Sequence, residues 1–193
     1  MHVAAKRRII VIGASTGGVQ ALDEVLACLT ANVLPTIVVI HMQERFTKLF
    51  AGRLNSKHLM HIKEAETGDK PKQGQILIAP GGKHTEIIDR GNGPEVRCFI
   101  GPRVHHVIPA AEILFESIAK VYGASAIGVI LTGMGGDGSG GLLAMRNKGA
   151  ATIGQNKETC VVYGMSKVAY EKGAVEHVLP LNKIGDKINT LSR

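Results

Sequence analysis

The stretch Gly13-Ala14-Ser15-Thr16-Gly17-Gly18 lies between an apolar run, residues 9–12, and an amphipathic segment, residues 19–29. This order predicts a strand, a tight glycine turn and the start of a helix. A serine at such a turn is held at the C-terminal edge of a sheet, beside helix N-terminal amides that can stabilise negative charge on an oxygen. The letters also match G-x-S-x-G, the nucleophile-elbow pattern. Ser15 is therefore a candidate nucleophile.

Two other interpretations of the same turn stay open. A glycine-rich turn after a first strand is common in the phosphate-binding loops of dinucleotide folds. Here the spacing lacks the G-x-G-x-x-G pattern, and no acidic residue ends a clear second strand. The turn could also be a plain strand-to-helix connection in which Ser15 caps the helix.

Outward from this stretch, strands and helices alternate. Strands are predicted at residues 8–12, 36–41, 126–131, 151–154 and 175–179. Helices are predicted at residues 18–29, 45–55, 109–121, 142–148, 163–172 and 182–191. Short strands at 61–65, 75–79, 85–89 and 95–100 predict a β-hairpin inserted in, or attached to, the edge of the sheet. The fold class is α/β: a doubly wound, mostly parallel sheet with helices on both faces and a β-hairpin excursion in the middle.

Composition limits the class of protein. With 193 residues, of which 45% are hydrophobic, we expect one domain over residues 8–193 after a tail or linker remnant, residues 1–7. The net charge of +7 comes from scattered basic residues and favours an acidic partner. Only 4% of residues are aromatic and Trp is absent, which argues against a base-stacking nucleic-acid surface. The longest apolar runs are strand-length, so no membrane insertion is expected.

The three cysteines are Cys28, Cys98 and Cys160, far apart in the sequence. An odd, unpatterned set fits a reducing cytoplasm, with each thiol a small buried hydrophobe. None has a metal-like spacing. The adjacent pair His105-His106 is interpreted as surface histidines rather than zinc ligands, because neighbours on an extended segment point to opposite faces and no Cys or carboxylate pattern completes a site.

Three polar residues are predicted to meet at one edge of the sheet. Ser15 follows the first strand and His41 ends the second. Asp137 lies in the loop after the strand at 126–131, where six of ten residues, 132–141, are glycine. In an open parallel sheet, ligands bind beyond the carboxyl ends of the strands. A serine needs a base to accept its proton, histidine can be that base near neutral pH, and a carboxylate on the far ring nitrogen fixes the tautomer.

The order Ser, His, Asp differs from the Ser, acid, His order of α/β-hydrolases, so the G-x-S-x-G match does not imply that fold. Backbone amides near Ser15 should stabilise an oxyanion, and Thr16 and Met134 are the candidates. Each residue also has a structural interpretation. His41 could be a hydrogen-bonded rim histidine, Asp137 could cap the helix that follows it, and Met134 could fill the core. Phe46 is interpreted as a core residue, with a wall of the cleft beside His41 as the alternative.

Several segments resemble one known family, in the family's order, from about residue 8 to the end. They are Ile12-Gly13-Ala14-Ser15-Thr16-Gly17-Gly18, His41-Met42, Leu131-Thr132-Gly133-Met134-Gly135-Gly136-Asp137-Gly138, and Glu158-Thr159-Cys160-Val161-Val162-Tyr163-Gly164-Met165. Together they resemble the catalytic domain of the CheB-type chemotaxis protein-glutamate methylesterases.

The resemblance implies a serine hydrolase that removes methyl groups from glutamyl methyl esters on the cytoplasmic helices of chemoreceptors. It also implies deamidation of receptor glutamines. By matching position, Ser15 would be the nucleophile, His41 the base and Asp137 the orienting acid. Thr16 and Met134 would supply auxiliary and oxyanion contacts. No cofactor, metal, nucleic acid or membrane insertion is expected, and the location would be cytoplasmic.

The sequence departs from the family pattern in places. Ile40 stands where the family usually has Gln, and residues 108–112 replace the usual Arg-Pro-Ser-Val-Asp. Family proteins usually carry an N-terminal receiver domain, and about seven residues before the first strand are too few for one; activity without phosphorylation is therefore expected. The alternatives are a Rossmann-like nucleotide-binding module without hydrolase activity, and a docking module that no longer catalyses.

Overall fold

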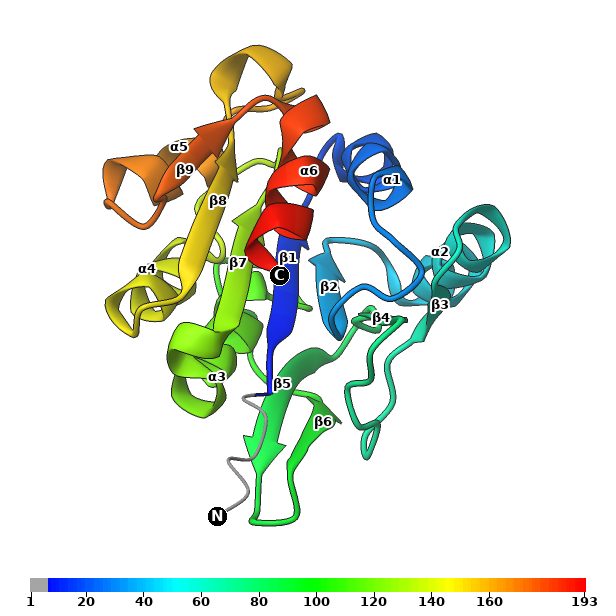
Figure 1. Cartoon of the computed structure of the whole chain (residues 1–193). Helices are drawn as coiled ribbons and strands as arrows, with labels where there is room; N and C mark the ends of the chain where they lie inside the picture. Colours follow the sequence, from blue (N-terminus) through cyan, green and yellow to red (C-terminus); the bar gives the residue numbers. More distant parts are fainter. Residues whose placement is uncertain (1–6) are drawn as a thin grey trace.

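The computed structural model describes residues 7–193 and is built around a sheet of seven strands (Figure 1). Their order in the sheet is β3-β4-β2-β1-β7-β8-β9, and every pairing between them is parallel. The strands are β1 (Ile9–Ala14), β2 (Thr36–Ile40), β3 (His61–Glu64), β4 (Gln75–Ile78), β7 (Ala126–Ile130), β8 (Ala151–Gln155) and β9 (His177–Leu179). The predicted α/β class and parallel sheet are confirmed.

Helices cover both faces of the sheet. One face carries α1 (Gly18–Ala27), α2 (Glu44–Lys57) and α6 (Leu181–Leu191), and Figure 1 shows α6 crossing in front of the central strands. The other face carries α3 (Ala111–Val121), α4 (Ser139–Asn147) and α5 (Met165–Glu171). Two short 3-10 turns are η1 (Gly123–Ser125) and η2 (Lys157–Thr159). Because side chains alternate along a strand, β1 sends Ile10 and Ile12 to one hydrophobic cluster and Ile9 and Val11 to the other.

The expected hairpin is present, but its placement was predicted wrongly. β5 (His84–Asp89) and β6 (Pro94–Phe99) pair antiparallel as a separate two-stranded sheet, which extends below the main sheet in Figure 1. It packs on α3, where Ile87 is buried and its N–H donates to Ser117 Oγ at 2.9 Å. The two preceding strands, β3 and β4, instead extend the parallel sheet.

α4 starts at Ser139, three residues earlier than predicted, and its first turn contains two glycines. A Cβ on Gly141 would lie 2.7 Å from Phe115 Cβ, so glycine is needed where α3 and α4 touch. Residues 139–141 are helical, although three consecutive Ser and Gly residues suggest a loop.

In the part of the chain that is described, no helix is both long enough and apolar enough to cross a membrane. The three cysteines are free thiols, but the prediction that all are buried was wrong: Cys28 is exposed, and Cys98 and Cys160 are half-buried. Residues 1–6 of the predicted tail lie outside the described residues.

Candidate functional site

Ser15 lies where β1 gives way to α1, at the centre of the carboxyl edge of the sheet. Its backbone N–H donates to Thr132 O at 3.0 Å, and its carbonyl accepts from Gly18 N at 2.7 Å. The first bond joins the end of β1 to the end of β7, its neighbour in the sheet, and the second closes the turn from β1 into α1. Within residues 7–193 the Ser15 hydroxyl makes no hydrogen bond, and it is not among the buried side-chain atoms without a partner. The hydroxyl is thus available to a substrate.

His41 and Asp137 form a close pair at the same edge. His41 follows β2, and its backbone N–H donates to Ala14 O at 3.1 Å, directly beside Ser15. His41 Nε2 lies 2.7 Å from Asp137 Oδ2. The side chains are 12% and 2% exposed. The structure therefore brings the three predicted residues to one edge, although no hydrogen bond joins Ser15 to His41 among the described side chains.

Asp137 also caps a helix, but not the one that the sequence suggested. Its Oδ2 accepts from Ala111 N at 2.6 Å and its Oδ1 from Glu112 N at 3.1 Å, at the start of α3. The interpretation as a cap of α4, the helix that follows it, is wrong. The Asp137 side chain thus occupies the capping position of α3, where two backbone N–H groups need an acceptor. Asp137 is thus held in place by two backbone amides while it orients the His41 ring.

Two free backbone amides flank the serine. In the described part of the chain, neither Thr16 N nor Met134 N donates a hydrogen bond. Gly133 brings the second amide close, because a Cβ on this residue would lie 2.7 Å from Ser15 Cβ. Any side chain at position 133 would displace the serine. Met134 itself is 76% exposed, so it does not fill the core.

Thr132 is a buried residue that the sequence analysis missed. Its Oγ1 donates to Thr16 O at 3.0 Å and accepts from Val162 N at 3.0 Å, and its carbonyl accepts from Ser15 N. The side chain therefore ties the serine turn to the glycine-rich loop and to the loop after β8. A polar residue between an apolar strand and a run of glycines is the signal that could have identified it.

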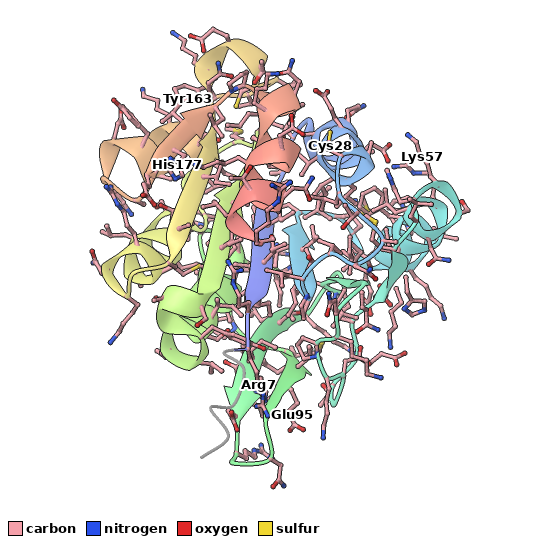
Figure 2. The ribbon with its side chains drawn as sticks, viewed as in Figure 1. Arg7, Cys28, Lys57, Glu95, Tyr163 and His177 are labelled. Carbon is pink, nitrogen blue, oxygen red and sulfur yellow. The ribbon has the colours of Figure 1, made fainter. Side chains whose placement is uncertain are left out.

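Gln155 supports Thr132 from the end of β8. Its Oε1 accepts from Thr132 N at 2.8 Å, and its Nε2 donates to Thr159 O at 2.8 Å. Gln155 is buried, and both ends of its amide are satisfied. The loop after β8 is thereby held against the carboxyl edge of the sheet, where Tyr163 lies in Figure 2, far from Arg7 and Glu95 at the opposite end.

A cleft of about 400 Å³ opens beside His41. It is lined by His41, Met42, Gln43, Glu44, Gly82, Arg103, Val107 and Ile108. The cleft extends from His41, at the carboxyl edge of the sheet, to Glu44 in the first turn of α2. Phe46, predicted as a core residue, is 43% exposed on that helix.

One group of side chains in the described residues has the spacing of a metal site. Ligand atoms of His105, Glu112 and Asp137 lie within 4.8 Å of one another. Burial raises the pKa of the Glu112 carboxyl, and the charge of Asp137 acts in the same direction while His105 opposes it. Both Asp137 oxygens already accept hydrogen bonds at a helix N-terminus, which disfavours a cation. The two carboxylates instead accept hydrogen bonds from backbone N–H groups, Asp137 from Ala111 and Glu112, and Glu112 from Gly140.

The interpretation of His105 and His106 as an extended pair was wrong. Both adopt left-handed backbone, with φ of 51° and 66°. This turn, rather than strand alternation, carries the His105 ring to 3.7 Å from Glu112 Oε2.

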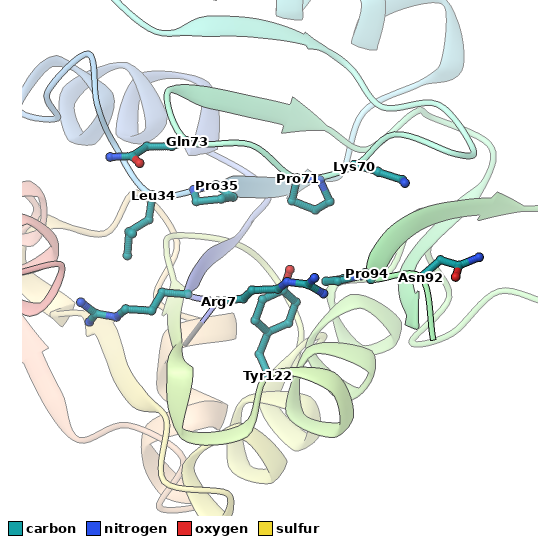
Figure 3. Close-up of a pocket in the computed structure, with 11 residues that line it drawn as sticks. Arg7, Leu34, Pro35, Lys70, Pro71, Gln73, Asn92, Pro94 and Tyr122 are labelled. Atoms are coloured by element: carbon teal, nitrogen blue, oxygen red, sulfur yellow. The ribbon is translucent and has the colours of Figure 1, made fainter. Parts of the chain in front are cut away.

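A second hollow, of about 470 Å³, lies at the opposite edge of the sheet (Figure 3). Its lining includes Arg7, Lys70 and Tyr122. Burial raises the pKa of Tyr122 to about 12, so this phenol stays protonated near neutral pH. The residues described around this hollow include no nucleophile–base pair, and the hollow is separate from the edge of the sheet that carries Ser15, His41 and Asp137.

Comparison with known proteins identifies close relatives. The family described as CheB methylesterase matches residues 10–188. A "Protein-glutamate methylesterase/protein-glutamine glutaminase 2" of Syntrophomonas wolfei subsp. wolfei is 47% identical over 95% of this chain and 54% of its own length. A "Protein-glutamate methylesterase/protein-glutamine glutaminase" of Agrobacterium fabrum is 49% identical over 97% of this chain and 54% of its own.

A solved structure gives the same result for the fold. The crystal structure of the Thermotoga maritima CheB methylesterase catalytic domain superimposes with a TM-score of 0.93 at 38% identity, covering 97% of this chain and 100% of the other. The chain spans about half the length of the curated relatives it matches. The nucleotide-binding alternative is not favoured, because these relatives are named as hydrolases.

Proposed function

The chain belongs to the CheB methylesterase family, and on that premise we propose that it hydrolyses glutamyl methyl esters of chemoreceptors with Ser15 as the nucleophile. One observation carries the assignment of roles: the His41–Asp137 pair, 2.7 Å apart, lies beside a serine whose hydroxyl is free among the described residues. The proposal extends to residues 8–193 as the catalytic domain and to the cytoplasm as its location.

His41 supplies the base. With Nε2–H donated to Asp137, the lone pair of the imidazole lies on Nδ1, which accepts the Ser15 proton when a substrate brings the two side chains together. Ser15 Oγ attacks the ester carbonyl, and a tetrahedral intermediate forms. His41 then returns the proton to the leaving methoxide, and methanol departs from an acyl-enzyme. Water, deprotonated by His41, releases the glutamate carboxylate and regenerates Ser15.

The amides of Thr16 and Met134 are proposed to stabilise the oxyanion of that intermediate. Their freedom from other acceptors supports this role. A glutamine side chain would form the same acyl-enzyme and release ammonia, which accounts for a deamidase activity of the same site.

The direct test measures methanol release from the methylated cytoplasmic fragment of a chemoreceptor. Wild type should release methanol, Ser15→Ala should release none, and the melting temperature should be unchanged because Ser15 is at the edge of the sheet. Ser125→Ala is the matched control, since Ser125 lies in η1, at the end of the sheet away from the site. Methanol release by Ser15→Ala at the wild-type rate would refute the proposal.

A further inference from the structure

The first two turns of α2 expose an unusual combination of side chains. We define the α2 outer face as Arg45, Phe46, Lys48 and Leu49, all of which are exposed, with Leu49 70% exposed. An exposed aromatic and leucine one turn apart on a helix, with cations on either side, are typical of a surface that binds another helix. The core does not need this face, because α2 buries Phe50, Ala51 and Leu54 on its other side.

The cations of the α2 outer face are available to a partner. Neither Arg45 nor Lys48 forms an ion pair within residues 7–193, and the Arg45 guanidinium lies 4.8 Å above the Phe46 ring. The end of the same helix differs. There Arg53 and Lys57, the latter labelled in Figure 2, are paired with Asp23 at 2.9 and 3.3 Å. Free positive charge is therefore confined to the end of α2 that is near the catalytic edge.

The α2 outer face is continuous with the cleft. α2 begins three residues after His41, and the cleft lining includes Gln43 and Glu44 at the helix start. Arg103 adds a further cation on the cleft wall. A chain segment with one side chain in the cleft would thus extend over the first turns of α2.

We propose that the α2 outer face binds an acidic, amphipathic segment of the protein substrate and so delivers its ester to Ser15. This inference rests on the proposed function, because a substrate of glutamyl esters also carries free glutamates and gains a carboxylate with each turnover. Arg45 and Lys48 complement those carboxylates, while Phe46 and Leu49 complement an apolar stripe. A second copy of this chain fits less well, since it carries a net charge of +7 and the same cationic face.

Binding is measured with the Ser15→Ala variant and the methylated cytoplasmic fragment of a chemoreceptor, so that no turnover occurs. In this background Arg45→Glu and Lys48→Glu together should raise the Kd roughly tenfold at low salt, because like charges then face each other. The difference should shrink as salt screens the surface charges. Leu49→Ala should also weaken binding. The helix should persist, because acidic residues are favoured near a helix N-terminus.

The matched control is Lys120→Glu with Lys148→Glu. Both lysines are exposed, and they lie at the ends of α3 and α4 away from the catalytic edge, so the net charge changes equally. The control should leave the Kd unchanged. An unchanged Kd in the α2 variant, or an equal rise in the control, would overturn the inference. If the fragment binds as expected but wild type releases no methanol, the proposed function fails while the docking surface stands.

Discussion

The Asp137 carboxylate accepts three hydrogen bonds from two parts of the molecule. His41 and Ala111 share Oδ2, while Glu112 N–H donates to Oδ1. An aspartate that only oriented a histidine would leave the start of α3 uncapped, and one that only capped a helix would leave His41 without a partner. A single buried carboxylate therefore links the proposed base to a helix that is packed in the core.

Asp137→Asn should damage both activity and stability. An amide offers one acceptor oxygen, so its NH₂ group would face either Glu112 N–H, at the Oδ1 position, or both His41 and Ala111 N–H, at the Oδ2 position. We expect the rate of ester hydrolysis to fall about 10⁴-fold, by analogy with other triads. The free energy of unfolding should fall by about 1–3 kcal/mol, because a buried donor loses its acceptor. Methanol release and urea denaturation test the two effects; full activity with lowered stability would reduce Asp137 to a cap.

Thr132→Val should lower kcat without a comparable rise in KM. The substitution keeps the shape but removes the hydroxyl that joins Thr16 O to Val162 N. We expect a loss of about 10²-fold in kcat, as is typical when catalytic groups shift slightly. The measurement is steady-state methanol release over a range of substrate concentrations.

Thr132→Ser is the control for this position, because it restores the hydroxyl. If the loop connection positions the site, Thr132→Ser should recover most of the kcat. Equal defects in the Val and Ser variants would mean that the methyl group, and hence packing, matters instead.

The sequence predicted the positions of the three proposed catalytic residues better than the positions of the residues that support them. Ser15, His41 and Asp137 follow strands, so parallel topology alone brings them to one edge. Thr132 and Gln155 act through hydrogen bonds between loops that are distant in sequence, and no local pattern encodes such contacts. Phe46 was predicted to be a core residue, and it lies four residues before the buried Phe50, but its side chain is exposed on the surface of α2.

At the scale of elements, Asp23 connects α1 to α2. It accepts from Arg53 at 2.9 Å and lies 3.2 Å from His58 Nε2, and Lys57 is also paired with it. Burial alone would raise the pKa of Asp23, but the hydrogen bonds from Arg53, His58 and Lys57 are stronger in sum and lower the pKa below 3.8. Because α2 follows His41 directly, this connection also fixes one wall of the cleft.

Asp23→Asn should lower stability in a pH-dependent way. Folding lowers the Asp23 pKa, so the ionised group stabilises the native state above pH 3.8, and that contribution is lost as the pH falls through the lowered pKa. The variant should be less stable than wild type by about 1 kcal/mol at pH 7. The difference in free energy of unfolding between wild type and variant should disappear as the pH falls through the lowered pKa. Urea denaturation across this pH range gives the comparison.

Asp186→Asn on α6 is the matched control, because no ion pair of Asp186 is found in the described residues. It should leave the free energy of unfolding unchanged across the same pH range. If Asp23→Asn remained less stable than wild type at the most acidic pH, the ionised carboxylate would not be the cause of the difference in stability.

Element types were largely predictable, whereas their partners were not. Buried strands such as β2 and β7 are runs of apolar residues, and helices such as α3 show a clear apolar face. The placement of β5 and β6 was not encoded locally, because a hairpin can pair with a sheet edge or pack on a helix with the same sequence. In the structure the hairpin packs on α3, where Ile87 and Val96 are buried and Ile87 N–H donates to Ser117 Oγ.

Across the whole molecule, β1 lies between β2 and β7, and this order determines the site. The chain leaves β1 toward β2 on one side and returns to β7 on the other. Residues 15 and 41 thereby come to the same edge as residue 137, which lies 96 positions after residue 41. Among residues 7–193, the lining of the hollow at the opposite edge includes cations but no such group of residues.

We propose that Ser15 becomes nucleophilic because His41 accepts its proton and Asp137 orients the His41 ring. The most direct measurement is covalent labelling of the whole chain by a fluorophosphonate, followed by peptide mapping. We predict a single modification on Ser15 that is absent in Ser15→Ala and strongly slowed in His41→Ala. Labelling of another residue, or labelling of Ser15 at an undiminished rate in His41→Ala, would contradict the account.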